Sequence, residues 1–210
     1  ALLPATSPDL VEYARRAGYQ AVVLAKQGLR PSDVVTMDSF ENAIMVHAAI
    51  SGSTNALLHL PAIAHEFGIS IDGDTFDRLH RGAKYLLDIR PAGRWPAEFF
   101  YYAGGVPAIM EEIRDVLHLD AMTVTGKTVG ENLKDRNARI LDTDVIHTID
   151  NAYSKEGGIA ILRGSLAPDG AVVKQSAVAP EMMRREVTAR VFESEDDALS
   201  LIHISEPTRH

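Results

Sequence analysis

The stretch that decides the fold runs from Asp38 to Gly68 and reads DSFENAIMVHAAISGSTNALLHLPAIAHEFG. Apolar residues recur at helical spacing on both sides of a small polar loop, which predicts two helices that each bury one face. Asp38, with Glu41 three residues later, predicts the N-cap and capping box of the first helix, and Gly68 predicts the C′ residue of the second. The apolar positions are Ile44, Met45, Ala48 and Ala49 in the first helix and Ala56, Leu57, Leu60, Ile63 and Ala64 in the second.

The polar loop between these helices consists of Ser51, Gly52, Ser53, Thr54 and Asn55. Hydroxyl and amide groups at a buried helix start are costly unless they form hydrogen bonds. A helix N-terminus also carries free N–H groups and a partial positive charge. The loop is therefore a candidate seat for a carboxylate, a phosphate or another anion. The alternative interpretation is that Ser53 or Thr54 simply caps the second helix.

The motifs F-E-N-A-I and S-G-S-T-N-A-x-x-H-L-x-A-I-A in this stretch resemble the core signature of the dihydroxy-acid dehydratase and phosphogluconate dehydratase family. Further matches follow in order: Y-A-G-G-V-P at 102–107, T-V-T-G-K-T at 123–128 and a long run at 156–177. Members usually carry glycine where Ser51 stands. The resemblance covers about residues 1–198, and R-W-P-A-E-F-F-Y-Y-A-G-G-V-P is closest to the sugar-acid, xylonate dehydratase-like branch.

This resemblance implies a hydro-lyase that removes water from a sugar acid or a 2,3-dihydroxy acid to give a 2-keto acid. It places the chain in sugar-acid metabolism or branched-chain amino acid biosynthesis. It also implies an iron–sulfur cluster, of the 2Fe–2S or 4Fe–4S type, and Mg²⁺ in the complete enzyme. The family's cluster cysteines, magnesium ligands, modified lysine and catalytic serine lie outside this chain. We therefore expect no catalytic residue and no metal ligand here, and an inactive isolated piece.

The substrate and cluster pocket is expected at Ser51–Asn55 and His59. None of the eight histidines forms a metal-binding spacing such as H-E-x-x-H. We therefore expect His47 and His59 to pack in the core or to support residues of a site, and not to bind a metal themselves. Gly104 and Gly105 follow four aromatic residues and would let the backbone approach a ligand closely. The alternative for that region is an aromatic core cluster at a helix end.

The order of patterns predicts an α/β chain. Residues 1–140 are expected to be the end of a helix-rich, cluster-bearing α/β domain, and residues 141–198 the first strands of a β-barrel-like C-terminal domain. The predicted helices lie at 8–28, 75–81, 107–117 and from 130, in addition to the central pair. The predicted strands are 85–89, 122–125, 159–162, 171–175 and 186–191, with Asp169-Gly170 as a hairpin turn. Gly126-Lys127-Thr128 is not a phosphate-binding P-loop, because Ala121 stands where that motif needs glycine.

The composition is that of an ordinary globular chain: 210 residues, 46% hydrophobic, 24% charged, with a net charge of −8. The negative charge argues against nucleic acid and anionic membranes as partners. No apolar run reaches the roughly 18–20 residues that span a bilayer, and no signal peptide is recognised, so a cytoplasmic location is expected. The chain has no cysteine, which excludes disulfides and a cysteine-ligated cluster within it. The partner expected is a small-molecule acid, and the complete protein is expected to be a homo-oligomer.

The chain is expected to be an internal fragment that starts just after the third cluster cysteine. Residues 199–210 resemble the translation of a sequencing-library adapter, so the natural sequence is expected to continue past Ala198. Two other function classes stay open. One is a phosphate-binding domain of sugar-phosphate metabolism that uses the helix start at Ser51–Asn55. The other is a non-catalytic interaction domain, against which the glycines in ordered motifs argue mildly.

Overall fold

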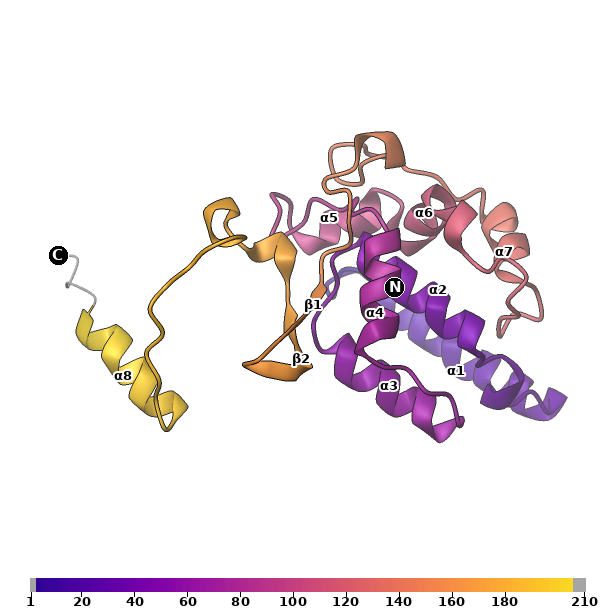
Figure 1. The fold of residues 1–210 in the computed structure, drawn as a ribbon. Helices are drawn as coiled ribbons and strands as arrows, with labels where there is room; N and C mark the ends of the chain where they lie inside the picture. The colour runs from indigo at the N-terminus through magenta and orange to yellow at the C-terminus, as the bar shows by residue number, and fades with distance from the viewer. Residues whose placement is uncertain (1–2, 206–210) are drawn as a thin grey trace. The chain divides into compact units, whose positions relative to one another are not determined.

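The computed structural model describes residues 3–205, and within them it contains eight α-helices and one two-stranded antiparallel sheet (Figure 1). Helices α1 to α7 precede the two strands and α8 follows them, so the predicted α/β fold class, helix-rich first, is confirmed. Most helices lie in the first two thirds of the chain. The elements are α1 (Asp9–Gln27), α2 (Met37–Ala49), α3 (Ala56–Glu66), α4 (Gly73–Gly82), α5 (Ala97–Tyr102), α6 (Gly105–Glu112), α7 (Val129–Arg136), β1 (Ala160–Gly164), β2 (Ala167–Val173) and α8 (Glu195–Ser205).

The chain divides into two compact units, Ala1–Val178 and Ala179–His210. In the second unit, the strand predicted at 186–191 is wrong: this segment is exposed and forms no strand, because no other segment between Ala179 and Ser205 pairs with it. Helix α8 contains residues 199–205 of the predicted adapter segment, and residues 206–210 lie outside the described part of the chain. The origin of that segment and the domain boundary at residue 140 stay predictions.

Helix α2 lies at the centre of the core of the first unit. The four residues predicted for its buried face are each at most 4% exposed, which confirms the helical pattern. The helix begins earlier than Asp38, however. The Thr36 hydroxyl accepts a hydrogen bond from the Ser39 amide, and the Ser39 hydroxyl accepts one from the Thr36 amide, so Thr36 is the N-cap. The capping box predicted for Asp38 and Glu41 does not form, because the Glu41 side chain bonds distant parts of the chain.

The F-E-N-A-I motif fixes helix α2 to distant parts of the chain. Glu41 pairs with Arg78 of α4 at 2.6 Å and lies 2.7 Å from the Nε2 atom of His118. The buried Asn42 side chain donates to the His118 carbonyl and accepts from the His118 amide, at 3.0 and 2.7 Å. The side-chain amide of Asn42 thus satisfies both backbone groups of His118, as a neighbouring strand would. In this way Asn42 fixes the segment that follows α6.

Two predicted strands are not regular strands in the structure. Residues 85–88 are buried and Ile89 is half-buried, but the segment forms isolated bridges to Ser154, Ile146 and Trp95 rather than a sheet. The strand predicted at 122–125 is wrong: the segment is a turn that closes a single bridge between Met122 and Thr128. Thr128 then caps helix α7, so the Gly126-Lys127-Thr128 run is used as a turn and a helix start.

The hairpin of β1 and β2 turns at residues 165–166, not at the predicted Asp169-Gly170. The register pairs Gly164 with Ala167 and Leu162 with Ala171, which leaves three residues of β2 opposite one residue of β1. Gly170 takes a φ of +111°, so the glycine serves an irregularity within the strand instead of the turn. The hairpin packs on α4, where the Ile161 amide donates to the Asp77 carboxylate at 3.1 Å.

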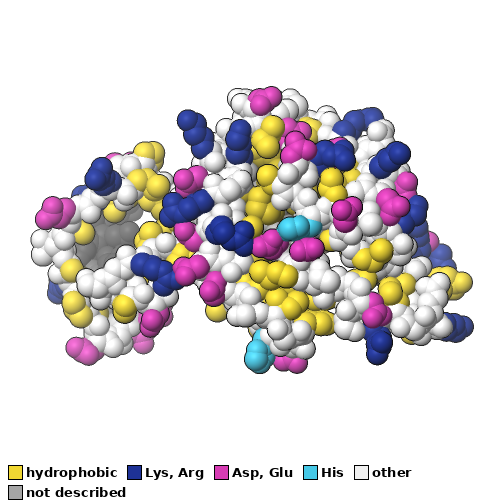
Figure 2. All heavy atoms as spheres, turned by 45° about the vertical axis from the view of Figure 1, so that its right-hand side comes forward, with side chains coloured by type: hydrophobic (Ala, Val, Ile, Leu, Met, Phe, Trp, Pro, Cys, Tyr) yellow, Lys and Arg dark blue, Asp and Glu magenta, His cyan; other side chains and the backbone are white. Residues whose placement is uncertain are grey.

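The predicted ends of two other helices are confirmed. Helix α1 starts directly after Pro8 and ends at Gln27 with Gly28 as its C-cap, and Gly68 lies just after the end of helix α3; both glycines have left-handed backbones. No helix within residues 3–205 is long and apolar enough to cross a membrane. On the face drawn in Figure 2, acidic and basic side chains are mixed over the first unit, with hydrophobic side chains between them.

Candidate functional site

The polar loop Ser51–Asn55 connects α2 to α3, and only its first residue is buried. Ser51 is 5% exposed and has a left-handed backbone with a φ of +49°, which accounts for the glycine expected there. The side chains of Ser53, Thr54 and Asn55 are exposed. Of the polar side chains that were expected to be buried before the second helix, only that of Ser51 is buried.

The start of helix α3 is not a free anion seat. The amides of residues 56–58 donate to the carbonyls of residues 53–55 at 3.1 Å each, and the Asn55 amide donates to the Ser53 hydroxyl at 3.3 Å. Local turns thus occupy the donors that an anion would need. The alternative, a side-chain cap by Ser53 or Thr54, does not form in the structure, since Asn55 is the N-cap of α3 and no side-chain cap bond is made there.

The segment Lys174–Ser176, directly after β2, forms hydrogen bonds to the start of this loop. The Lys174 ammonium donates to the carbonyls of Ser51 and Gly52 at 2.9 and 3.3 Å. The Ser176 hydroxyl lies 2.6 Å from the Ser51 hydroxyl. Three hydrogen bonds across more than 120 positions of sequence therefore connect the end of the hairpin to the start of the polar loop.

Gly157 and Gly158, which follow Glu156 ahead of β1, make this contact possible. A Cβ atom on Gly158 would stand 1.9 Å from the Ser51 hydroxyl oxygen, so no side chain fits there. The side-chain amide of Gln175 donates to the Gly157 carbonyl at 2.6 Å. The glycines thus allow two parts of the same chain to approach each other, which is a structural use of the motif.

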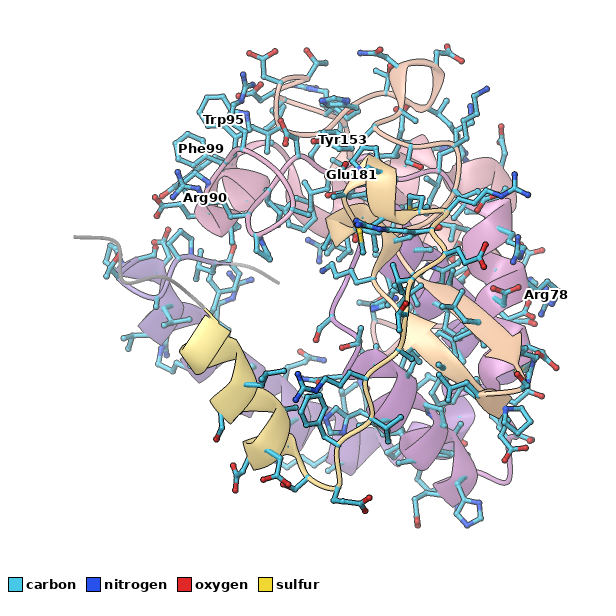
Figure 3. All side chains as sticks on the ribbon, turned by 60° about the vertical axis from the view of Figure 1, so that its left-hand side comes forward. Arg78, Arg90, Trp95, Phe99, Tyr153 and Glu181 are labelled. Carbon is cyan, nitrogen blue, oxygen red and sulfur yellow. The ribbon has the colours of Figure 1, made fainter. Side chains whose placement is uncertain are left out.

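A cavity of about 390 Å³ opens beside this junction. Its lining includes residues 50–54 and a wall formed by Tyr85, Leu87, Ile89 and Phe100. The charged residues of the lining are Lys174 and Arg90, and among the described residues no carboxylate lines it. Arg90 forms no ion pair within residues 3–205, and Figure 3 shows it next to Trp95 and Phe99.

The charges of the lining decide which kind of ligand the cavity favours. Two cations without a carboxylate between them favour an anionic ligand, and the hydroxyls of Ser53 and Thr54 offer hydrogen bonds to it. Burial raises the pKa of Tyr85 to about 12, with smaller effects from Tyr153 and Asp88, so its phenol stays neutral at pH 7. The part of the lining formed by Tyr85, Leu87, Ile89 and Phe100 is therefore uncharged.

The predicted site residues are only partly brought together. Residues 51–54 line the 390 Å³ cavity, whereas Asn55 and His59 are exposed and are not among its lining residues. Sequence reasoning missed Arg90 and Lys174 as part of the site. Lys174 lies within the matched run at 156–177, but its neighbours in sequence do not indicate that its ammonium reaches the polar loop at 51–55.

The glycine pair Gly104–Gly105 lies in a different cavity, of about 720 Å³, beside Tyr101 and Tyr102. Gly104 has a φ of +118°, and a Cβ atom on it would stand 2.6 Å from the Arg139 carbonyl oxygen. The close approach that Gly104 permits is therefore an approach of the chain to itself. The aromatic run supplies one fully buried ring, Phe100, in agreement with the core alternative.

The residues that the structure describes do not fit an iron–sulfur cluster or a bound divalent cation. The sequence has no cysteine, and within residues 3–205 no three His, Asp or Glu side chains group as ligands. Cluster and magnesium ligation therefore have no donor set in the part of the chain that the structure describes.

The sequence matches two domains of one enzyme family. Residues 1–132 match the dihydroxy-acid/6-phosphogluconate dehydratase N-terminal domain, and residues 144–208 match the C-terminal domain. The chain belongs to the dihydroxy-acid/6-phosphogluconate dehydratase family.

Relatives named dihydroxy-acid dehydratase match nearly the whole chain. The one from Acetivibrio thermocellus is 48% identical over 203 residues, which are 96% of this chain and 36% of that protein. The one from Solidesulfovibrio magneticus is 50% identical over 198 residues, or 93% and 35% of the two chains. The one from Caldicellulosiruptor saccharolyticus is 47% identical over 202 residues, or 95% and 36%. The chain thus spans about a third of the length of these relatives.

Proposed function

We propose that this chain is part of a hydro-lyase that dehydrates a 2,3-dihydroxy acid to a 2-keto acid, and that the 390 Å³ cavity binds the carboxylate end of the acid. The observation that carries the proposal is the charge of the cavity. Lys174 and Arg90 face it, the hydroxyls of Ser53 and Thr54 adjoin them, and no described carboxylate offsets the two cations. Membership of the dehydratase family supplies the reaction class.

The reaction sets clear demands on such a site. A base takes the C2 proton of the acid, the C3 hydroxyl leaves and becomes water, and the resulting enol rearranges to the 2-keto acid. In this proposal, Lys174 and Arg90 neutralise the carboxylate, and the serine and threonine hydroxyls orient the substrate. The apolar wall at Tyr85, Leu87 and Phe100 keeps water from that side of it.

The base and the cofactor ligands are proposed to lie in the parts of the family's sequence that this chain does not span. An iron–sulfur cluster and Mg²⁺ in the complete enzyme are part of the proposal, and this chain would contribute substrate contacts without ligating either. The isolated chain is then expected to bind the acid without converting it. A cytoplasmic location and a homo-oligomeric complete protein belong to the same proposal.

The choice between a branched-chain dihydroxy acid and a sugar acid such as xylonate concerns the same cavity. The relatives named above carry the name dihydroxy-acid dehydratase, which makes the 2,3-dihydroxy acid the first class to test. The sugar-acid branch suggested by R-W-P-A-E-F-F-Y-Y-A-G-G-V-P stays a prediction. Both acids share the carboxylate and the adjacent hydroxyl on which the proposal depends.

The second candidate is phosphate binding in the same cavity. Two cations beside two hydroxyls suit a phosphate as well as a carboxylate. The helix start gives no additional support, since the amides of residues 56–58 already donate to local carbonyls. Phosphate binding would therefore depend on Lys174 and Arg90 rather than on the N-terminus of α3.

Binding of small anions to the ¹⁵N-labelled chain tests the proposal. We expect 2,3-dihydroxy-3-methylbutanoate to shift the NMR signals of Thr54, Lys174 and Arg90, and its neutral primary amide to shift them much less. Xylonate tests the sugar-acid branch, and inorganic phosphate tests the second candidate. Equal shifts with the acid and the amide, or shifts confined to other parts of the chain, would contradict the proposal.

A further inference from the structure

Two histidines that the proposed function does not use form a hydrogen-bonded pair directly behind the polar loop. The Ile159 amide lies 3.2 Å from the Nδ1 atom of His80, in the interior of the first unit. The Nε2 atom of His80 lies 3.2 Å from the Nδ1 atom of His47. The Nε2 atom of His47 lies 2.8 Å from the Ser53 carbonyl oxygen. One continuous chain of three hydrogen bonds thus joins the entrance of the hairpin to the polar loop.

The two ends of this chain fix the direction of every bond in it. A backbone N–H group can only donate, so the Nδ1 atom of His80 accepts from Ile159, and neutral His80 carries its proton on Nε2. That Nε2–H group donates to the Nδ1 atom of His47. His47 therefore carries its own proton on Nε2, and this group donates to the Ser53 carbonyl. One protonation pattern of two neutral rings satisfies all three bonds.

The packing around the rings prevents them from adjusting separately. A Cβ atom on Gly52 would stand 2.2 Å from the Cδ2 atom of His47, and one on Gly157 would stand 2.7 Å from the Nδ1 atom of His80. His80 is 1% exposed. Each ring thus rests against a glycine backbone, so a movement of His80 displaces both the loop and the entrance of the hairpin.

We propose that His80 is a positioning residue for the site: through His47 it sets the place of the Ser53 carbonyl, and its protonation state couples the polar loop to the hairpin. The proposal rests on the proposed function only in taking the loop as a wall of the substrate cavity. A proton on the Nδ1 atom of His80 would leave the Ile159 amide without an acceptor, with two donors facing each other.

Burial, together with the charges nearby, keeps both rings neutral at pH 7. Burial lowers the pKa of His80 to about 4, assisted by the neighbouring His47 and opposed by the Asp77 carboxylate on the same helix. Burial also lowers the pKa of His47, against the Ser53 carbonyl, and the Lys174 ammonium acts in the same direction as burial. The neutral, directional chain of bonds is thus the ground state of the folded unit.

NMR of the 210-residue chain tests this without any ligand. At pH 7 we expect both imidazoles to carry the proton on Nε2, seen in their ¹⁵N shifts. On acidification, the ¹³C signal of the Ser53 carbonyl should move with the titration of His80, a residue that it does not touch. In His80→Phe that shared midpoint should disappear, and in His65→Phe, an exposed histidine of α3, it should stay.

Two results would overturn the proposal. One is a proton on the Nδ1 atom of either ring at pH 7. The other is a Ser53 signal that does not respond while His80 titrates. The wild-type chain suffices for both readings if His80→Phe fails to fold. Because these measurements use no ligand, a failure here leaves the acid-binding test above unaffected, and absence of acid binding leaves the histidine pair intact.

Discussion

Mild acid should destabilise the folded chain through His80. Burial and the neighbouring His47 lower the pKa of this histidine to about 4, whereas an unfolded histidine titrates at about 6.5. Between these pH values the unfolded chain binds more protons than the folded chain, so the free energy of unfolding rises with pH. The contribution of His80 is therefore fully present above pH 6.5 and is lost as the pH falls towards 4.

The two pKa values set the size of this effect. At about 1.4 kcal/mol for each pKa unit, complete titration removes about 3 kcal/mol, and about 2 kcal/mol of it is lost by pH 5. Glu41 does not interfere in that range. The hydrogen bond from Arg78, and after it the one from His118, lower the pKa of Glu41, so its contribution is lost only at more acidic pH.

Urea denaturation at pH 7, 6 and 5 measures the effect. The wild-type chain and the exposed control His65→Phe should each lose about 2 kcal/mol between pH 7 and pH 5. His80→Phe should be less stable at pH 7, because the Ile159 amide loses its acceptor. Its loss of stability between pH 7 and pH 5 should be clearly smaller than that of the wild type, and the remaining part comes from His47, whose pKa burial also lowers. A wild-type stability that is flat from pH 7 to pH 5, or an equal slope in His80→Phe, would refute the reasoning.

Substitutions at three positions test other contacts. Asn42→Ala should cost about 2 kcal/mol in urea denaturation, because both backbone groups of His118 lose their partner; a cost below about 0.5 kcal/mol, the range of an uninvolved surface change, would contradict the bridging role. Ser51→Ala should be less stable than Ser51→Gly by about 1 kcal/mol, since only glycine is unstrained in the left-handed region; equal stabilities would show that the Ser176 hydroxyl bond alone matters. Thr54→Val should weaken acid binding yet change stability by less than about 0.5 kcal/mol, and a larger loss would show that Thr54 supports α3.

Local patterns predicted the helices well because helix starts and stops depend on nearby residues. The left-handed glycines at Gly28 and Gly68 were predicted correctly, and so was the buried face of α2. The start of α2 was misplaced because Asp38 and Glu41 fit the cap pattern as well as Thr36 and Ser39 do. Thr36 is the N-cap because Glu41 is not free for a local capping bond: its carboxylate bonds residues of distant segments.

Strands and the site were harder to predict because they depend on contacts between distant residues. Asp169-Gly170 has the sequence of a tight turn, but the pairing of Leu162 with Ala171 draws it into β2. The polar loop was predicted as an anion seat from helix physics, whereas the cations beside it, Lys174 and Arg90, come from other parts of the chain. No local pattern shows that these side chains face one cavity.

The affinity of the chain for an acid and for its neutral amide tests the central claim most directly. We predict that 2,3-dihydroxy-3-methylbutanoate binds at least about tenfold more tightly than its primary amide, a difference of about 1.4 kcal/mol. Lys174→Met should remove most of this preference, and Lys26→Met, an exposed lysine at the end of α1, should leave it unchanged. Equal affinities in the wild-type chain, or a preference that survives in Lys174→Met, would contradict a carboxylate site between the polar loop and the hairpin.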